Sequence, residues 1–366
     1  MIKQLYHFSM NGSKGTNIIY NEFPLVSIVI PHFNGEEILL DCLKSLKKSN
    51  YPNLEIIVVD NGSSDNSIKV VREKFSNIKI ISSEKNRGYA GGCNLGAQNA
   101  LGNFLFFLNN DTIQEPSCIS DLIKIFIENP TVSAVQPKIL NFFEKDSFDY
   151  AGGCGGHLDI FCFPFVKGRL FNSIEKDNGQ YDYDDEIFWA SGTAMMIIKK
   201  DFIDCGGFDE FFFAHQEEID LQWRLHLRNK KIKINPHAIV YHKNAMTLSS
   251  DSVKKKYLNH RNSLLMMLTN YSLSNLFFIF PVRLLLEFIA LFYSLFLFDL
   301  KHFIAILRSL IWFILNPITI YKRRQKFSKD FIRNDANIIS HMYRRSIVFD
   351  FFILQKKNYL NLDIAS

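Results

Sequence analysis

Several carboxylates and one histidine stand where they could bind a cation or move a proton. Asp60 and Asp111 each follow a short apolar run, at 55–59 and 104–108. An aspartate at the end of a strand can accept a hydrogen bond from a base or a ribose, or hold a divalent cation against a diphosphate. The other candidates are three acids at a predicted helix start and one histidine after a predicted strand, namely Glu217, Glu218, Asp220 and His242.

Each of these residues also has a structural interpretation. Residues 109–111 read Asn-Asn-Asp, which is a favourable turn and cap. The acids at 217–220 would stabilise a helix start through the helix dipole. An isolated histidine such as His242 is more often structural than a ligand. Residue type alone therefore leaves both interpretations open.

The elements that must position these residues form an alternating pattern from residue 25 onward. Short apolar runs alternate with amphipathic stretches, which is the β-α-β pattern of a parallel sheet. Strands are expected at 26–30, 55–59, 78–81, 104–108 and 132–135, and helices at 37–48, 68–75, 93–101 and 116–128. The loops at the carboxyl ends of such strands converge on one edge of the sheet, where ligands bind.

Residues 141–186 break this rhythm. The glycine-rich stretch 151–156 and the acidic stretch 181–186 indicate an irregular loop region rather than sheet, of the kind that shapes a substrate cleft. Trp189 could present its ring to the apolar face of a sugar or belong to the core, and both interpretations stay open. Regular structure is expected again as a strand at 188–198, a helix at 217–228 and strands at 231–234 and 238–242.

Two other classes of site lack their motifs. The glycine-rich loop at 84–96 fits neither G-x-G-x-x-G nor a P-loop, so a dinucleotide-dependent dehydrogenase loses its main support. The six cysteines form no C-x-x-C pair and no zinc-finger arrangement with histidine, so we expect reduced thiols. They are Cys42, Cys93, Cys118, Cys154, Cys162 and Cys205.

Charge is divided unevenly along the chain. Residues 1–253 carry 25 Lys+Arg against 31 Asp+Glu, and residues 254–366 carry 17 against 6, so the two parts have formal charges of −6 and +11. The basic part is strongly apolar and Phe-rich, and it lacks the spaced aromatics in a polar context that single-strand binders use. These features favour an anionic membrane surface over nucleic acid as a partner.

Beyond residue 257 the sequence predicts apolar helices. Charged residues interrupt them, so no clean span of ~20 apolar residues is visible. Polar residues recur every seven positions, as Glu287, Ser294, Lys301 and Arg308. This period predicts one polar side on a helix that lies in the membrane interface. The basic run 322–326 would strengthen the docking, or it is a solvated charge run after a packed helix.

Seven segments of the chain carry a family resemblance through their order. They are VSIVIPHFNG, VVDNGSSDNS, EKNRGYAGGCNLG, FLNNDT, QPKIL, WASGTAMMIIKKDFIDCGGFDEFFFAHQEEIDLQWR and VYHKNAMT. In this order they resemble the family 2 glycosyltransferases, especially the bacterial rhamnosyltransferase-like branch. The resemblance covers residues 25–265 and implies a GT-A fold, an α/β architecture with a Rossmann-like, mostly parallel sheet. It also implies a nucleoside-diphosphate sugar as donor, such as a dTDP- or UDP-sugar.

The resemblance assigns a donor site and a cofactor. The implied donor residues are Pro31, Asn34, Asp60, Arg87, Gly88, Asn110 and Asp111. Asp60 would contact the nucleobase, with Arg87 and Gly88 near the base and ribose. Asp111 would be the ligand of a divalent metal, Mg²⁺ or Mn²⁺, in the D-x-D site, whose first position is Asn109 here. His242 matches a metal-ligating histidine of some relatives.

The acidic segment matches the position of the family's catalytic carboxylate. The family has Asp where this chain has Glu218, whose extra methylene shifts the carboxylate. Glu218 would take a proton from an acceptor hydroxyl as that oxygen attacks the anomeric carbon in a single in-line displacement, so the configuration inverts. Glu217, Asp220 and Trp189 are expected to support the base or the acceptor.

Three rival functions have discriminating features. A processive polysaccharide synthase would show several clean membrane spans and a Q-x-x-R-W motif, whereas residues 222–224 read Gln-Trp-Arg. A nucleotidyltransferase would carry a glycine-rich, basic loop where residues 32–34 read His-Phe-Asn. A catalytically inactive, membrane-bound homologue that only binds sugar nucleotides would have lost Asp60, Asp111 or the acidic pair. Non-processive transfer to a glycan or lipid-linked acceptor is the favoured interpretation.

We therefore expect three regions. An N-terminal extension at 1–24, without an evident secretory signal, precedes a GT-A catalytic domain at 25–256 and a helical C-terminal region at 257–366. Within the catalytic domain, a donor half is expected at 25–137 and an acceptor half at 138–256. The expected location is the cytoplasmic face of the inner (plasma) membrane, with peripheral or monotopic attachment through the C-terminal region.

Overall fold

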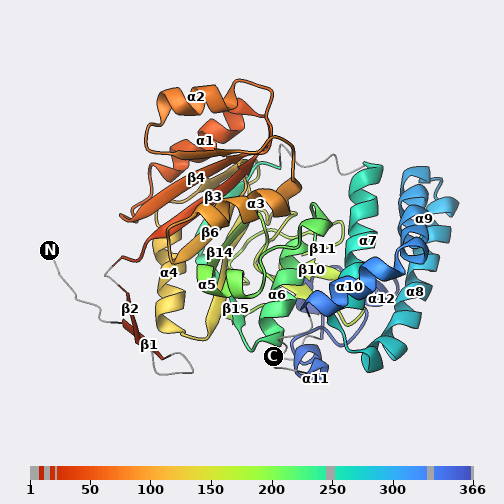
Figure 1. Ribbon diagram of the computed structural model, residues 1–366. Coiled ribbons are helices and arrows are strands. Elements are labelled where there is room, and N and C mark those ends of the chain that lie inside the picture. Colours follow the sequence, from red (N-terminus) through yellow and green to blue (C-terminus); the bar gives the residue numbers. More distant parts are fainter. Residues whose placement is uncertain (1–7, 12–16, 21–22, 245–251, 328–333, 364–366) are drawn as a thin grey trace.

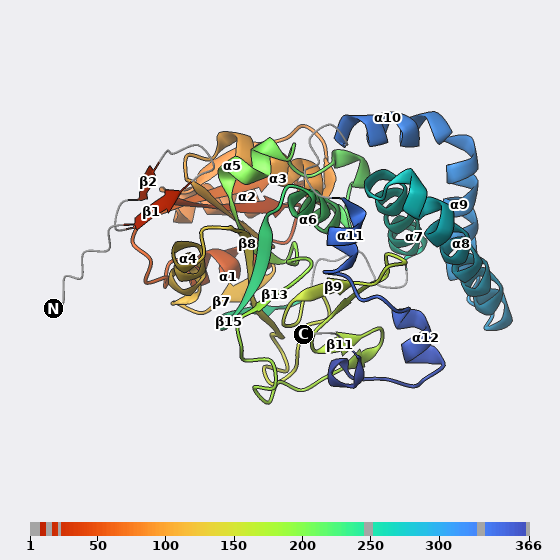
Figure 2. The same ribbon diagram turned by 90° about the horizontal axis from the view of Figure 1, so that it is seen from below.

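The structure is a computed structural model that describes residues 8–11, 17–20, 23–244, 252–327 and 334–363. A mixed sheet lies at its centre, with helices on both faces and a further group of helices at one side (Figure 1, Figure 2). The strands follow the order β13 (Asp185–Glu186), β15 (Lys231–His242), β8 (Val132–Asn141), β14 (Ala194–Ile198), β6 (Phe104–Leu108), β3 (Val26–His32), β4 (Leu54–Asp60), β5 (Lys79–Ser82), with β7 (Thr112–Gln114) paired to β15.

The first half of the sheet is parallel, as the alternating pattern predicts. β3 pairs in parallel with β4 and β6, and β4 pairs in parallel with β5. The intervening helices are α1 (Glu36–Leu46), α2 (Ser67–Lys74) and α3 (Gly88–Asn99). Alternate residues of β6 enter different core clusters, with Leu105 and Phe107 in one and Phe104 and Phe106 in the other. Both faces of this part of the sheet are therefore covered.

Helix α3 begins at Gly88, earlier than the predicted start at 93. Its first turns carry glycines, which a sequence pattern assigns to a loop. Here glycine allows close packing, because a Cβ on Gly96 would lie 2.3 Å from Val29 Cγ1 and one on Gly92 would lie 2.8 Å from Asn61 Nδ2. The helix approaches the sheet closely because these positions lack side chains.

The second half of the sheet is mixed. β14 runs antiparallel between β6 and β8, and β15 runs parallel to β8. The helices of this half are α4 (Cys118–Glu128), α5 (Lys199–Asp204) and α6 (Glu217–Leu227), and η1 (Glu210–Phe212) is a 3₁₀ turn. The two strands predicted at 231–234 and 238–242 are one strand, β15, because a register shift between Asn235 and Ile239 absorbs the residues between them.

Residues 141–186 contain a small antiparallel sheet, so the expectation of an irregular region is wrong. Its strands are β9 (Gly156–Leu158), β10 (Pro164–Val166), β11 (Arg169–Leu170) and β12 (Ser173–Ile174). Each strand is only two or three residues long, so no apolar alternation can reveal it. The tight turn between β10 and β11 includes Gly168, whose φ of +93° favours glycine.

The C-terminal region is helical, as expected. It consists of α7 (Val253–Asn270), α8 (Leu273–Phe296), α9 (Leu300–Leu315), α10 (Pro317–Phe327), α11 (Asp335–Ile339), α12 (Ile347–Phe352) and the 3₁₀ turn η3 (Tyr359–Asn361). Its last part returns to the α/β core, where Tyr343, Ile347, Phe351 and Tyr359 share a cluster with Val29 of β3. Near the other end of the chain, β1 (Phe8–Asn11) and β2 (Asn17–Tyr20) pair with each other.

The four polar residues predicted to share one side of one helix lie on two helices. Glu287 and Ser294 of α8 face the protein, whereas Lys301 and Arg308 are exposed on α9. Arg283, Glu287 and Ser294 of α8 are buried. Glu287 accepts a hydrogen bond from Arg283 Nη2 at 2.5 Å and lies 2.7 Å from His260 Nδ1 of α7. The exposed side carries large apolar residues instead, including Phe277, Phe278, Leu285, Ile289, Phe292 and Phe296.

By length and composition, α8 could cross a membrane, with a mean hydropathy of 2.1 over its most apolar window. This corrects the expectation of no clean span, because the charges of Arg283 and Glu287 are paired within the protein. α9 and α10 meet at a bend of 77°. Only the two helices together are long and apolar enough to cross a membrane. Such helices are weak evidence for spanning, since buried core helices share these properties.

Candidate active site

The loops after β3 and β4 meet at one edge of the sheet and are tied to each other. Ser64 N donates to Asn34 Oδ1 at 2.8 Å, and Asn34 N donates to Ser63 Oγ at 3.0 Å. Asp60, at the end of β4, accepts from Ser63 N at 2.8 Å. Asn34 has a φ of +56°, a conformation that asparagine tolerates better than most residues. Asn34 and Asp60 of the predicted donor site are thus held in one rigid pair of loops.

Asn110 and Pro31 lie in the interior behind these loops. Asn110 Nδ2 donates to His32 Nδ1 at 2.8 Å, which leaves the other ring nitrogen of His32 to donate to Ser67 Oγ at 2.8 Å. Pro31 is buried, and a Cβ on Gly92 would lie 3.1 Å from Pro31 Cβ. These contacts connect the ends of β3 and β6, so both residues position the loops in this structure.

Arg87 and Gly88 connect the donor loops to the segment before α6. Arg87 Nη2 donates to both carboxylate oxygens of Glu210, at 2.9 and 3.0 Å. Gly88 has a φ of +70°, and a Cβ there would lie 2.2 Å from the carbonyl oxygen of Phe213. Only glycine fits this position, so the two loops can be in direct contact.

Asp111 and His242 are in contact, although 130 residues separate them along the chain. Their Oδ1 and Nε2 atoms are 3.1 Å apart, and Asp149 Oδ1 lies 2.9 Å from the other ring nitrogen, Nδ1. All three side chains are almost fully buried. Burial lowers the pKa of His242, but the hydrogen bonds to the two aspartates outweigh it and raise the pKa to about 10.

This pair fits a divalent cation as part of a larger ligand set. Adjacent ligands of an octahedral cation are about 3 Å apart, which matches the observed Asp111 to His242 separation. Asp149 supplies the carboxylate that commonly orients a metal-bound imidazole. Across the described part of the chain, no group of three or more His, Cys, Asp or Glu side chains could hold a metal alone. Phosphate oxygens would have to complete the coordination.

Glu217 and Glu218 stand at the start of α6. Burial raises the pKa of Glu218 to about 7, although main-chain hydrogen bonds from Gly192, Gln216 and Glu218 itself oppose the shift. Burial, followed by the charge of Glu218, raises the pKa of Glu217 well above its usual range. One oxygen of each carboxyl group is buried and has no hydrogen-bond partner among the described residues. A carboxylate with a pKa near neutrality is suited to general base catalysis.

Gly192 connects this carboxyl group to the loop of Asp111. Its main chain lies beside Glu218, where it lowers the carboxyl pKa, and its carbonyl accepts a hydrogen bond from Tyr89 Oη at 2.5 Å. The next residue, Thr193, accepts from Asn109 N at 2.9 Å, two residues before Asp111. Glu218 and Asp111 therefore belong to one hydrogen-bonded cluster of loops. The strand predicted at 188–198 is therefore shorter than expected. Residues 188–193 form this connection, and only Ala194–Ile198 are a strand, β14.

The loop before α6 has an unusual backbone that side chains from α7 hold in place. Phe213, His215 and Gln216 have φ of 66°, 70° and 70°, which is costly for residues other than glycine. Asn262 Nδ2 donates to the carbonyls of Ala214 and His215, at 3.0 and 2.7 Å. The adjacent Arg261 donates to the carbonyls of residues 211 and 212.

Arg261 and Asn262 are site residues for which the residue-by-residue analysis found no role. The only signal was an Arg-Asn pair in the first helix after the predicted domain, within the polar run 259–263. Both side chains are buried, with Asn262 fully inaccessible. A buried polar pair requires partners, and here the partners are the carbonyls of the strained loop.

Asp220 and Trp189 have structural contacts in the interior. Asp220 is fully buried and pairs with Arg224 and Arg323, each at 3.0 Å. These charges outweigh its burial and lower its pKa, so Asp220 stays ionised. Trp189 Nε1 donates to the carbonyl of His157 at 2.8 Å within a buried cluster. Both side chains are held by these interior contacts, and the supporting role expected for them stays a prediction.

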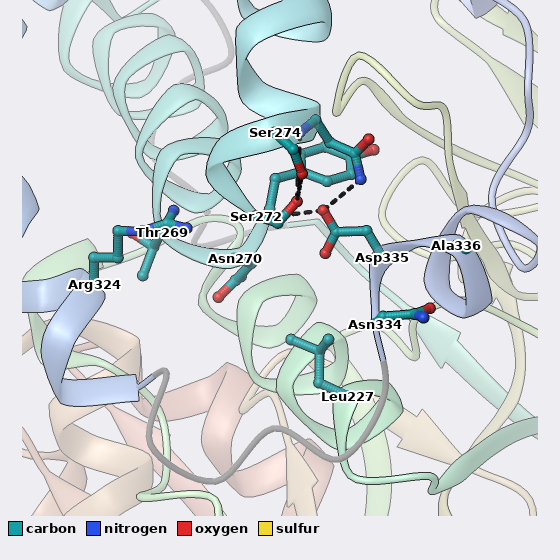
Figure 3. Close-up of a pocket in the computed structure, with 11 residues that line it drawn as sticks. Leu227, Thr269, Asn270, Ser272, Ser274, Arg324, Asn334, Asp335 and Ala336 are labelled. Atoms are coloured by element: carbon teal, nitrogen blue, oxygen red, sulfur yellow. Dashed lines mark hydrogen bonds between the residues drawn. The ribbon is translucent and has the colours of Figure 1, made fainter.

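A defined pocket lies elsewhere. It has a volume of about 480 Å³ and is lined by the ends of α6 and α7, the start of α8, and residues of α10 and α11 (Figure 3). Its polar groups largely bind one another, as where Asp335 accepts from Ser272 N at 2.7 Å and from Asn275 Nδ2 at 2.6 Å. It contains none of the predicted site residues. The clustered loops around Glu218 are therefore the better candidate site.

Comparisons with known proteins identify a family for the α/β part of the chain. Residues 27–204 match the family model described as Glycosyl transferase family 2. The poly-beta-1,6-N-acetyl-D-glucosamine synthase of Staphylococcus epidermidis is 28% identical over 220 residues, which are 59% of this chain and 49% of the synthase. Glycosyltransferase GlyG of Streptococcus pneumoniae is 24% identical over 224 residues, 59% of this chain and 70% of GlyG. The chain thus spans about half the length of the synthase it matches.

A solved structure supports the fold. The crystal structure of GalNAc-T7 with UDP, GalNAc and Mn²⁺ superposes with a TM-score of 0.54 at 16% identity, over 69% of this chain and 49% of that chain. At this identity the likeness shows the fold alone. With the mixed sheet, the family match and the named relatives together, residues 27–204 are identified as a family 2 glycosyltransferase domain with a GT-A fold, and a C-terminal group of helices follows it.

Proposed function

We propose that the protein is an inverting, non-processive glycosyltransferase in the assembly of a cell-surface polysaccharide. The donor is a nucleoside-diphosphate sugar, such as a dTDP- or UDP-sugar, and the acceptor is a hydroxyl of a glycan or a lipid-linked glycan. The observation that carries this proposal is the cluster in which Gly192 and Thr193 join Glu218 to the loop of Asp111. A base near neutral pKa and a cation site share this cluster.

Glu218 is the base in this mechanism. Its carboxylate accepts the proton of the acceptor hydroxyl while that oxygen forms a bond to the anomeric carbon. The bond from the anomeric carbon to the diphosphate breaks on the opposite face, which inverts the configuration. The nucleoside diphosphate leaves without a proton, so a second carboxyl group is not needed as an acid. Glu217, held protonated by its raised pKa, leaves the single negative charge on Glu218.

Asp111 and His242 would hold Mg²⁺ or Mn²⁺ beside the donor diphosphate. When bound, the cation supplies charge neutralisation for the departing group. The 3.1 Å separation of the two side chains and the buried Asp149 behind His242 support this assignment. Asp60, Asn34, Arg87 and Gly88 would surround the base and ribose at the adjacent loops.

We also propose that the protein docks on the cytoplasmic face of the inner (plasma) membrane through α8 and α9. Most exposed side chains of these two helices are apolar, although Lys301 and Arg308 of α9 are also exposed. Arg283 and Glu287 of α8 are buried, which is the reverse of a helix on a water-exposed surface. Both helices lie at the side of the molecule (Figure 1). Of the basic run 322–326, Lys322 and Lys326 are exposed and could meet anionic lipid, whereas Arg323 is buried.

Processive synthesis is the second candidate, because the similar Staphylococcus protein is named a poly-beta-1,6-N-acetyl-D-glucosamine synthase. Product length separates the two. The first experiment is a screen of UDP- and dTDP-sugars with Mn²⁺ or Mg²⁺ for hydrolysis and binding, with Glu218→Gln as the inactive control. Metal-dependent hydrolysis that this variant loses supports the proposal. Equal hydrolysis by both proteins overturns the assignment of the base, and a ladder of long products supports the synthase.

A further inference from the structure

Two cationic side chains lie beside the candidate site, and both are close to one aromatic ring. The guanidinium carbon of Arg169, on β11, is 4.2 Å from the centroid of the Tyr150 ring. Lys255 Nζ, on α7, is 5.6 Å from the same centroid. These three residues come from segments that are far apart in the sequence, so the fold brings them together.

Neither cation has an anionic partner within the ranges that the structure describes. Arg169 Nη1 donates to the carbonyl of Phe171 at 3.0 Å, but Nε is buried and has no partner. Lys255 is 8% exposed and forms no ion pair there. Asp149 attracts Arg169, yet its carboxylate already binds His242 and Asn244. Burying cations without anions is costly, so two of them together indicate a site for an anionic ligand.

Two contacts place this pair at the active site. Tyr150 directly follows Asp149, which holds His242 at 2.9 Å. Lys255 lies close to His215, and its positive charge helps to lower the pKa of that imidazole. Burial is the larger cause, and together they lower the pKa to about 4. His215 is three residues before Glu218, and its Nε2 is buried without a partner in the described structure.

The small sheet is built to present Arg169. The turn before it requires Gly168, because a Cβ there would lie 2.3 Å from the ring of Phe148, two residues before Tyr150. This close contact joins the turn that carries Arg169 to the segment that carries Tyr150. Lys255 is supplied by α7, the helix that also packs against the apolar α9.

We propose that Arg169 and Lys255, beside Tyr150, bind a phosphate group of the acceptor, which is a phosphorylated lipid carrying a sugar. This inference rests on the proposed function. The donor diphosphate is a less suitable occupant, because Asp111 faces Nε2 of His242 whereas Asp149, the residue before Tyr150, faces Nδ1 on the other side of the imidazole. Phosphate matches a guanidinium and an ammonium group by charge and by hydrogen bonding.

The test measures binding rather than turnover, with farnesyl phosphate as a short lipid phosphate probe and UDP with Mn²⁺ as the donor probe. Arg169→Gln and Lys255→Gln should each weaken farnesyl phosphate binding at least about tenfold, the effect of losing one charge-assisted hydrogen bond. UDP binding should change less than about twofold. Lys176→Gln is the matched control, because Lys176 is an exposed cation that follows β12 of the same small sheet. Arg169→Lys should restore part of the affinity.

Three results overturn the proposal. Parallel losses of UDP and farnesyl phosphate binding would assign the cations to the donor diphosphate. Unchanged farnesyl phosphate binding in folded variants would leave the cations without a ligand role. Equal binding of farnesol would show that the prenyl chain alone is recognised. With the unmodified protein, inorganic phosphate should displace farnesyl phosphate, which tests the site without any substitution. If phosphate binding holds while no nucleotide sugar is bound or hydrolysed, the proposed function fails and the phosphate site remains.

Discussion

The side-chain amide of Asn262 donates to the main-chain carbonyl of His215 at 2.7 Å. Asn262 lies on α7, outside the α/β sheet, whereas His215 belongs to the strained loop that ends at Glu217 and Glu218. The same amide also binds the carbonyl of Ala214 at 3.0 Å. The position of the base is therefore controlled from the C-terminal helices, and the packing of α7 becomes part of the catalytic geometry.

Asn262→Ala should lower kcat about 10- to 100-fold with little change in donor affinity. The substitution removes the donor to several carbonyls, so the loop can relax toward ordinary φ values and displace Glu218, and small displacements of a catalytic group carry penalties of this size. Steady-state kinetics with calorimetric UDP binding measure both quantities. Asn259→Ala on the same helix is the control, because only the main-chain carbonyl of Asn259 binds this loop. A drop in UDP affinity equal to that in kcat would contradict the positioning role.

Glu218→Gln should reduce transfer at least about 10²-fold while UDP binding survives, since only the proton acceptor is lost. In the unmodified protein, kcat should rise with pH through about 7 and level off above it, because Glu218 must be deprotonated to act. The variant's residual rate should lack this step. A flat profile for the unmodified protein between pH 6 and 8 would assign the base to another group.

The same pKa has the opposite effect on folding. The folded pKa of Glu218 is raised from 4.5 to about 7, so the folded protein binds more protons than the unfolded chain between these values. The protonated Glu218 therefore stabilises the folded protein at low pH, and this contribution is lost as the pH rises from 4.5 to about 7. Glu218→Gln should unfold at a higher temperature than the unmodified protein at pH 8, with a smaller difference at pH 5. Equal melting temperatures at pH 8 would show that the carboxylate is not strained by burial.

Asp111→Asn should remove the increase in UDP affinity that a divalent cation provides. The amide keeps the shape of the side chain but loses the charge that a hard cation requires. Titrations of UDP with and without Mn²⁺ separate the two contributions, and affinity without metal should be unchanged. His242→Gln should give the same pattern. A metal effect that survives both substitutions would place the cation elsewhere.

Arg323→Ala should lower the free energy of unfolding by about 3 kcal/mol, because it leaves part of the charge of Asp220 buried without compensation. Arg323 also pairs with Asp209. Urea denaturation measures the effect. The neighbouring Arg324→Ala should cost about 1 kcal/mol, since Arg324 donates to the carbonyl of Leu268. Equal effects of the two substitutions would mean that α10 is held mainly by apolar packing.

Replacing Phe277 and Phe278 by serine should weaken co-sedimentation with anionic vesicles roughly 100-fold, because each side chain is more than 70% exposed and would lose its burial in lipid. Phe143→Ser is the control, since Phe143 is 73% exposed but lies in the α/β part of the chain. Unchanged vesicle binding would show that this face does not contact lipid.

The parallel half of the fold could be predicted because each buried strand is a short apolar run flanked by polar turns. Phe104–Leu108 is such a run, and the strand occupies those residues. α3 began earlier than predicted because its glycines serve packing, which depends on the neighbouring strand and not on local propensity. The strands of the small sheet escaped detection because two residues, as in β11, carry no periodicity.

The sequence could name candidate site residues but not their contacts. The period of seven placed Glu287 and Arg308 on one side of one helix, but the chain breaks between α8 and α9, so Glu287 is buried and Arg308 is exposed. Asp220 and Glu218 are two residues apart, yet Asp220 meets Arg323 from a distant helix while Glu218 meets Gly192. Their different environments arise from tertiary contacts, which a resemblance to a family motif does not specify.

The return of residues 343–362 to the α/β core has a consequence for how the chain folds during synthesis. Tyr343, Ile347 and Tyr359 complete a cluster that begins with Val29, but they follow α8 and α9 in the chain. The apolar helices therefore leave the ribosome before the core can close. With the proposed docking of α8 and α9, a nascent chain would meet lipid while its α/β core is still incomplete, so membrane contact would precede catalytic competence in the life of each molecule.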